Sequence, residues 1–208
     1  MRSDVKMGPI RFLIFLIILT FALIHSVQSL AESFTYDGHG LTSTSADQEL
    51  KEHICLSFMI FLEARGDGEL SQMFHGMATI NRVLNPKRWG DSVCETIIRP
   101  SQYESVKSAE QNVIMSVIKG DYNAADDFII TYYNTHDDLN VWYEINQIAY
   151  SLITAPRREA EWFDADHFYS PKSLKDRNLP VEDWIYTKEL VIVAGTTHFL
   201  KGKLDDSN

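Results

Sequence analysis

Phe61-Leu62-Glu63-Ala64-Arg65-Gly66 closes the first helix that this sequence predicts. Apolar residues recur at helical spacing from residue 50 onward, and Asp47 is a candidate N-cap, so the helix is expected from near Asp47 to Ala64. Gly66 then breaks the helical pattern. The stretch therefore places one carboxylate, Glu63, at the junction of an apolar helix and a polar turn.

A carboxylate in that position is expected to lie partly in apolar protein and partly in a cleft. Burial disfavours the charged form, so the pKa of Glu63 should be raised and the acid should keep its proton near neutral pH. A protonated glutamate in a groove is what acid-catalysed cleavage of a glycosidic bond requires. Taken alone, a Glu before a Gly is more often a solvated helix end, and this alternative stays open at this point.

The remaining pattern predicts an α+β fold, mainly helical with a small C-terminal β-sheet. Leu190 to Leu200 and Asp166 to Tyr169 are rich in β-formers, with Gly195 as a turn, and no βαβ alternation is present. Asp91 or Ser92 is expected to cap the helix at residues 91–99. Four further helices are expected, at residues 69–85, 91–99, 107–118 and 137–154. The second helix is expected to place on one face Leu70, Met73, Met77, Ile80 and Leu84.

Composition indicates one ordinary domain with an appendage. The chain has 208 residues, of which 45% are hydrophobic and 12% aromatic, enough for a packed core. The net charge of −10 argues against a nucleic-acid binder. An anionic polymer would have to be recognised locally and not by attraction to the whole surface.

The N-terminus is typical of an export signal. Arg2, Lys6 and Arg11 precede an apolar run from Phe12 to Ile24, which is shorter than the ~20 residues needed to span a bilayer. We expect residues 1–31 to be a cleaved signal peptide, with an uncleaved membrane anchor as the alternative. Either way the protein is exported, to the periplasm, the cell wall or the medium.

The rest of the chain is expected to divide into three parts. Glycines and a Ser/Thr cluster in residues 32–49 predict a polar linker. Residues 50–203 are expected to be the catalytic domain, and residues 204–208 a tail. Because the protein is exported and has only two cysteines, Cys55 and Cys94, one disulfide between them is predicted.

Short motifs along residues 50–200 resemble the SleB-like cell-wall hydrolase family. The motifs of the first half are Cys55-Leu56, Phe61 to Gly66, Asn81-Arg82-Val83, Val93-Cys94 and Ser101-Gln102-Tyr103. Those of the second half are Trp142 with Ile148-Ala149, His167-Phe168-Tyr169 with Pro171, Trp184, and Gly195 with His198-Phe199. Their order and spacing carry the resemblance more than any one of them. Two features depart from the family pattern. Tyr103 stands where the family usually has Phe. Residues 105–140 differ from the short loop often found at this place in the family, so the outer wall of the groove is in question.

The resemblance implies a lysozyme-like or lytic-transglycosylase-like domain that cleaves peptidoglycan glycan strands, with Glu63 as the catalytic acid. In a transglycosylase Glu63 would then take the proton of the muramoyl C6 hydroxyl, and a 1,6-anhydro ring would form. A hydrolase would need a second carboxylate. The candidates for that carboxylate are Asp67, Glu69, Glu104, Asp164 and Asp166. Because no motif assigns any of them to the cleft, the transglycosylase mechanism is favoured.

Several other residues are expected near the substrate. Tyr169 is the candidate second catalytic residue, because its hydroxyl could hydrogen-bond near the reacting centre. Gln102 suits an acetamido group, and Tyr103 could stack on a sugar face. His167 and Trp184 are further substrate-binding candidates, although Trp184 could equally belong to the core. Asn81 and His198 are expected to be structural, and Arg65 to orient the turn or pair with a carboxylate.

Other classes of function stay open. A zinc amidase or peptidase is disfavoured because the chain has no His-Glu-x-x-His motif, and no metal or cofactor is expected. A cysteine amidase could use Cys55 with His167, but Cys94 argues for a disulfide instead. A non-catalytic wall-binding domain is the third alternative. We expect a monomer that contacts the membrane only through its N-terminus, in wall remodelling, spore germination or, with slight preference, phage lysis.

Overall fold

The computed structural model describes residues 46–100, 102–154 and 163–202. The chain divides into a unit from Met1 to Ser43 and a compact unit from Thr44 to Asn208. The predicted signal peptide at residues 1–31, the linker up to residue 45 and the tail at 204–208 lie outside the described residues. The fold account therefore concerns the second unit.

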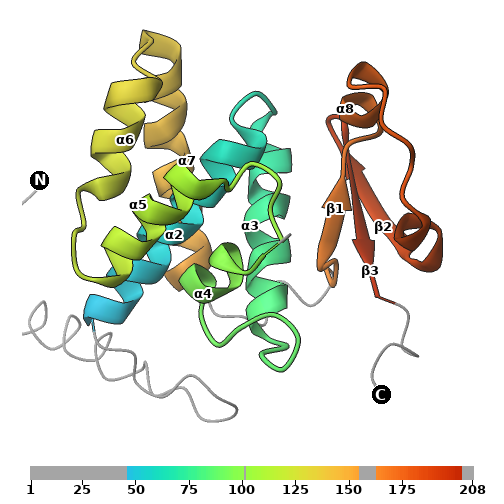
Figure 1. Ribbon diagram of the computed structural model, residues 1–208, viewed down its shortest axis with the longest axis horizontal. Coiled ribbons are helices and arrows are strands. Elements are labelled where there is room, and N and C mark those ends of the chain that lie inside the picture. Colours follow the sequence, from blue (N-terminus) through green and yellow to red (C-terminus); the bar gives the residue numbers. More distant parts are fainter. Residues whose placement is uncertain (1–45, 101, 155–162, 203–208) are drawn as a thin grey trace, which may run out of the picture. The chain divides into compact units, whose positions relative to one another are not determined.

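This unit is α+β, as predicted: seven α-helices and a three-stranded antiparallel sheet near the C-terminus form in the described residues (Figure 1). The helices are α2 Ala46–Ala64, α3 Glu69–Val83, α4 Val93–Ile98, α5 Ser108–Ile118, α6 Ala124–Tyr132, α7 His136–Thr154 and α8 Pro171–Asp176. The strands are β1 His167–Tyr169, β2 Glu189–Ala194 and β3 Thr197–Lys201, and a 3-10 helix, η2, spans Asp183–Thr187. Within the described residues no helix is both long and apolar enough to cross a membrane.

Helix α2 is the centre of the helical part. Its residues are buried almost without interruption from Ile54 to Ala64, and it packs against α3, α4, α5 and α7. A helix that is apolar on nearly all sides is stable only when other helices surround it. The helix begins at Ala46, so residues 46–49 of the predicted linker are helical. Asp47 therefore lies inside the first turn and is not the N-cap; its carboxylate pairs with Lys51 Nζ at 2.8 Å.

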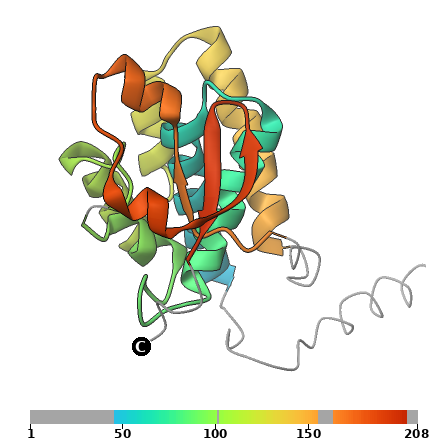
Figure 2. The same ribbon diagram turned by 90° about the vertical axis from the view of Figure 1, so that its right-hand side faces the viewer.

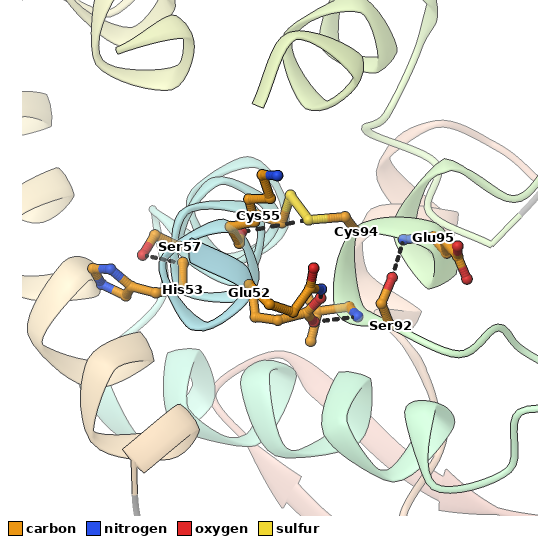
Figure 3. Close-up of a disulfide and its surroundings, with 10 residues drawn as sticks. Glu52, His53, Cys55, Ser57, Ser92, Cys94 and Glu95 are labelled. Atoms are coloured by element: carbon orange, nitrogen blue, oxygen red, sulfur yellow. Dashed lines mark hydrogen bonds between the residues drawn. A yellow bond between two sulfur atoms is a disulfide. The ribbon is translucent and has the colours of Figure 1, made fainter. Parts of the chain in front are cut away.

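The predicted disulfide is present and joins α2 to α4. Cys55 and Cys94 are both buried and lie 5.3 Å apart between Cα atoms (Figure 3). The start of α4 is fixed beside it, because the Ser92 side chain accepts from Glu95 N at 3.1 Å and caps the helix. Glu52 on α2 also accepts from Val93 N at 2.5 Å. The short helix α4 is thus held by one covalent and two polar links.

Helix α3 lies between the helical core and the sheet. Phe74, Met77 and Ala78 belong to a second cluster of buried residues that includes Phe199 of β3. The expected apolar face was partly wrong, because Leu70 and Leu84 are more than half exposed. On the other side α3 closely approaches α7, where a Cβ at Gly76 would lie 2.4 Å from a methyl carbon of Leu152.

The sheet has the strand order β1-β3-β2, with both pairings antiparallel. Phe168 pairs with Phe199, and the hairpin between β2 and β3 turns at Gly195, whose φ of +58° suits glycine. Figure 2 shows the three strands in front of the helices. Asn81 of α3 donates to the carbonyl oxygens of Phe163 and Ala165, at 2.9 and 2.8 Å, so it has the structural role expected and holds the segment that leads into β1.

Candidate functional site

A cleft of about 1180 Å³ is lined by residues of the helical part and of the sheet part. Glu63 and Asp67 contribute from the end of α2 and the turn after it, and His75 and Arg82 from α3. The opposite wall comes from β1 and from the segment between residues 170 and 188, which contains α8 and η2. Every residue predicted to contact the substrate lines this one cleft.

Glu63 lies in the last turn of α2 and is half-buried. One carboxylate oxygen, Oε1, accepts from Ser105 Oγ at 2.5 Å and from Ser105 N at 3.3 Å. Burial raises the pKa of Glu63 above its ordinary value, and this effect outweighs the lowering by the Ser105 bonds and by the Arg82 guanidinium. Ser105 was not among the predicted site residues.

Arg82 is a buried cation in the wall of the cleft, 4% exposed. Its Nε donates to Asp166 O at 2.6 Å and its Nη1 to Gln102 O at 3.2 Å. The guanidinium carbon lies 4.7 to 5.2 Å from the ring centroids of Tyr103, Trp89 and Phe168. Arg82 thus links the loop before Ser105 to the strand that carries His167, and its side chain is stabilised by aromatic faces.

Gln102 and Tyr103 both line the cleft but differ from expectation in detail. Gln102 Nε2 donates to Pro100 O at 3.3 Å. Tyr103 is only 5% exposed and its hydroxyl is hydrogen-bonded to Thr79 Oγ1 at 2.8 Å, and burial raises its pKa. Little of the Tyr103 ring is available for stacking on a sugar. The ring instead packs against the Arg82 guanidinium, whose carbon lies 4.7 Å from the ring centroid.

His167 is the most constrained of the predicted substrate-binding residues. Its Nδ1 lies 2.5 Å from Asp166 Oδ1, and its ring centroid lies 5.2 Å from that of Trp89 and 5.6 Å from that of Trp184. Asp166 Oδ1 also accepts from Gly202 N at 3.2 Å. Burial raises the pKa of Asp166, but His167, the Gly202 N–H and the Arg82 guanidinium together lower it more, so the carboxyl pKa lies below its ordinary value.

Tyr169 and Trp184 form the outer part of the same wall. Both are half-buried, and their ring centroids are 6.5 Å apart. Trp184 Nε1 donates to Glu182, and Tyr169 packs edge-on against His198 at 5.1 Å. In the described residues the Tyr169 hydroxyl makes no hydrogen bond to Glu63, so the direct neighbour of the acid is Ser105 and not Tyr169.

His75 is a second histidine of the cleft, which sequence reasoning missed. Its Nδ1 lies 2.8 Å from Ser71 O, and the ring packs edge-on against Phe168 and Phe199. Burial lowers the pKa of His75 to about 4, so the imidazole is neutral at physiological pH. A histidine at this point of an apolar helical pattern is expected to be a packed core residue. No signal in the sequence distinguishes a core histidine from one that lines a cleft.

The five candidates for a second carboxylate differ in whether they line the cleft and in which groups they contact. Asp164 pairs with Lys201 at 3.0 Å and Asp166 with His167, and Glu69 does not line the cleft. Asp67 lines it and accepts from Ser71 Oγ at 3.0 Å. Glu104 also lines it, but its carboxylate is paired with Arg177 Nη2 at 2.6 Å.

The wall opposite Glu63 is not formed where the family pattern suggested. Residues 105–140 contribute nothing to the lining, whereas the segment from Ser170 to Lys188 contributes much of it. Helices α5 and α6 instead pack against one another, with α5 against α2 and α6 against α7, on the helical side. Arg65 points to the same side: its guanidinium lies 4.6 Å from the Tyr133 ring centroid, and its Nε lies 4.0 Å from Asp138 Oδ1.

The described geometry also bears on the two alternative enzyme classes, the cysteine amidase and the zinc amidase or peptidase. Cys55 is in a disulfide and carries no thiolate, which overturns the cysteine-amidase alternative. No group of three His, Cys, Asp or Glu side chains suited to a metal occurs in the part of the chain that the structure describes.

No protein-family model, curated protein or solved structure matches this chain.

Proposed function

We propose that the protein is an exported enzyme that cleaves the glycosidic bond between N-acetylmuramic acid and N-acetylglucosamine in peptidoglycan, with Glu63 as the acid. The observation that carries the proposal is the state of Glu63 in the cleft: burial raises its pKa, and Ser105 holds one carboxylate oxygen. The other oxygen, Oε2, has no hydrogen-bond partner in the described residues, so it is the atom from which a proton can pass to the substrate.

The same geometry favours a transglycosylase over a hydrolase. Of the carboxylates that line the cleft with Glu63, Glu104 is bound to Arg177, Asp67 to Ser71 and Glu182 to Trp184. A hydrolase needs a second carboxylate placed beside the reacting carbon, whereas a transglycosylase can use one carboxylate as acid and then as base. We infer that the products carry 1,6-anhydromuramyl ends and that the helical unit belongs to the lysozyme-like and lytic-transglycosylase-like folds.

The aromatic wall supports a carbohydrate substrate. Tyr169 and Trp184 present half-buried rings to a cleft that also contains Gln102 and His167. Rings with a polar tip can cover the apolar face of a sugar and hydrogen-bond to its rim. An exported wall-cleaving enzyme of this kind suits phage lysis, wall remodelling or spore germination.

The test is digestion of purified peptidoglycan by wild-type protein and by Glu63→Gln. We expect the variant to lose at least ~100-fold in rate, because positioned acids contribute 10²–10⁴-fold. Mass spectrometry of the wild-type products should show anhydromuramyl ends; reducing ends would mean hydrolysis.

Glu69→Gln is the matched control, because Glu69 lies in the first turn of α3 outside the cleft. It should keep wild-type activity. Full activity in Glu63→Gln, or release of free stem peptides by the wild type, would contradict the proposal.

A further inference from the structure

The Asp166–His167 pair is a second acid–base group in the cleft that the proposed mechanism does not use. The His167 Nδ1 lies 2.5 Å from Asp166 Oδ1. Because a carboxylate accepts hydrogen bonds, Nδ1 is the protonated nitrogen and donates a hydrogen bond to Asp166. When the ring is neutral, Nε2 is then the nitrogen with the lone pair. No hydrogen bond to Nε2 is made by any described residue, and His167 lines the cleft.

The pair is held from several directions. Asp166 O accepts from Arg82 Nε at 2.6 Å, Asp166 N donates to Leu200 O at 3.0 Å, and Gly202 N donates to the carboxylate. The imidazole is flanked by the rings of Trp89 and Trp184. A histidine whose tautomer and ring plane are both fixed in this way is prepared to exchange a proton at its other nitrogen.

Arg82 places this pair in the same electrostatic environment as Glu63. The guanidinium acts on both carboxyl groups, lowering the pKa of each, and it donates directly to the Asp166 backbone. The other charged side chains that line the cleft are Asp67, Arg88, Glu104, Arg177, Glu182 and Lys188. Glu63 and His167 therefore line one cavity, and Arg82 acts on the carboxyl groups of Glu63 and Asp166.

We propose that His167, oriented by Asp166, is the base that takes the proton from the attacking hydroxyl, in place of a second carboxylate and in place of Glu63. Glu63 gives its proton to the glycosidic oxygen as the bond from that oxygen to C1 breaks. The attacking oxygen bonds to C1, and its proton passes to Nε2 of His167. The imidazolium then releases this proton, Glu63 takes one up, and both groups return to their starting states. The inference rests on the proposed function and replaces its base step. With His167 as the base, the ends of the products, and not the lack of a second carboxylate, decide whether the attacking hydroxyl belongs to the sugar or to water.

The test compares His167→Gln and Asp166→Asn with wild type on soluble peptidoglycan fragments. We expect His167→Gln to lower kcat by ~100-fold or more, as loss of a general base does, with KM changed less than about threefold. The wild-type profile of kcat/KM against pH should be bell-shaped, because two groups ionise, and that of His167→Gln should show one ionisation. Asp166→Asn should lower kcat as well, because an amide can stabilise the wrong imidazole tautomer.

The controls separate this role from folding and from the proposed function. Circular dichroism and thermal unfolding should show that the variants are folded, and His136→Gln, at an exposed site on α7, should behave as wild type. Added imidazole should restore part of the activity of His167→Ala. Full kcat in His167→Gln, an unchanged bell-shaped profile, or a loss confined to KM would overturn the inference and leave Glu63 as the single group. Full activity in Glu63→Gln would instead overturn the proposed function.

Discussion

Two consecutive residues act on Glu63 in opposite directions. Ser105 donates two hydrogen bonds to its carboxylate and favours the charged form, whereas the negative charge of Glu104 disfavours it. The pKa of the acid is thus set by a loop that lies about 40 residues further along the chain. Substitutions in that loop should change the pH range of activity without removing the acid.

Ser105→Ala removes the shorter of the two bonds. We expect the pKa of Glu63 to rise further, because the bond to Ser105 Oγ lowers it in the wild type. Since the proposed mechanism uses the protonated acid, the alkaline limb of the pH–rate profile should move to higher pH. Kinetics across the pH range on soluble fragments will measure this, and a shift to lower pH would contradict the assignment.

Glu104→Gln is the matched change at the next residue. It removes the like charge, so the pKa of Glu63 should fall and the alkaline limb should move to lower pH. The Glu104–Arg177 pair is largely exposed, so its loss should cost the fold little. If both variants moved the limb in one direction, the local electrostatic account would be wrong.

At the residue scale, the end of α2 next to Glu63 could be predicted because a helix end and a turn are local signals. Sequence reasoning missed Ser105 because the contact joins residues 42 positions apart in the chain, and nothing local requires it. Tyr103 was assigned to the substrate from its residue type, but its hydroxyl is hydrogen-bonded to Thr79 of α3, a contact 24 positions away in the chain that no local pattern predicts.

At the scale of elements, the helices with strong apolar periodicity were predicted well. Five helices and the β2–β3 hairpin lie close to their expected bounds. Helix α6 was not predicted, because Phe128 to Tyr132 is a run of β-formers whose local preference is overridden by packing against α5. Helix α8 was missed although it carries a readable signal, with Ser170 as the N-cap before a proline.

The disulfide is the covalent tie between the central helix and α4, the helix that leads to the loop with Ser105. Replacing Cys55 and Cys94 with serine should lower the free energy of unfolding by about 2–4 kcal/mol, because the bond closes a loop of 39 residues' separation in the unfolded chain. Urea unfolding of oxidised wild type and of the double variant will measure this. Wild type with added reductant should approach the variant, and equal stability of all three would refute the prediction.

At the scale of the whole molecule, two buried groups make stability depend on pH in opposite senses. The pKa of Glu63 is raised, so the folded state holds this proton more tightly than the unfolded chain, and ionisation at higher pH destabilises the fold. The pKa of His75 is lowered to about 4, so acidification favours the unfolded chain, which binds this proton first. His75 therefore stabilises the fold above the ordinary histidine pKa of about 6.5, and the benefit declines as pH falls toward 4.

His75→Gln tests this linkage. Between pH 7 and about pH 4.5 the wild type should lose about 2 kcal/mol through His75, from the difference between a pKa near 6.5 in the unfolded chain and about 4 in the fold. The variant should lack this part of the loss, whatever its stability at pH 7. Urea unfolding at the two pH values gives the comparison, and an equal loss in both proteins would contradict the buried neutral state.

The two walls of the cleft differ in how deeply their elements are buried. Glu63 and Arg82 belong to helices that form the core, whereas α8 buries no residue and η2 buries only Ile185. Changes in the stretch between Ser170 and Lys188 should therefore cost the fold little, although they alter what the cleft accepts. Under the proposed function, randomising this stretch would change which glycans the cleft accepts while the acid stays in place on its helix.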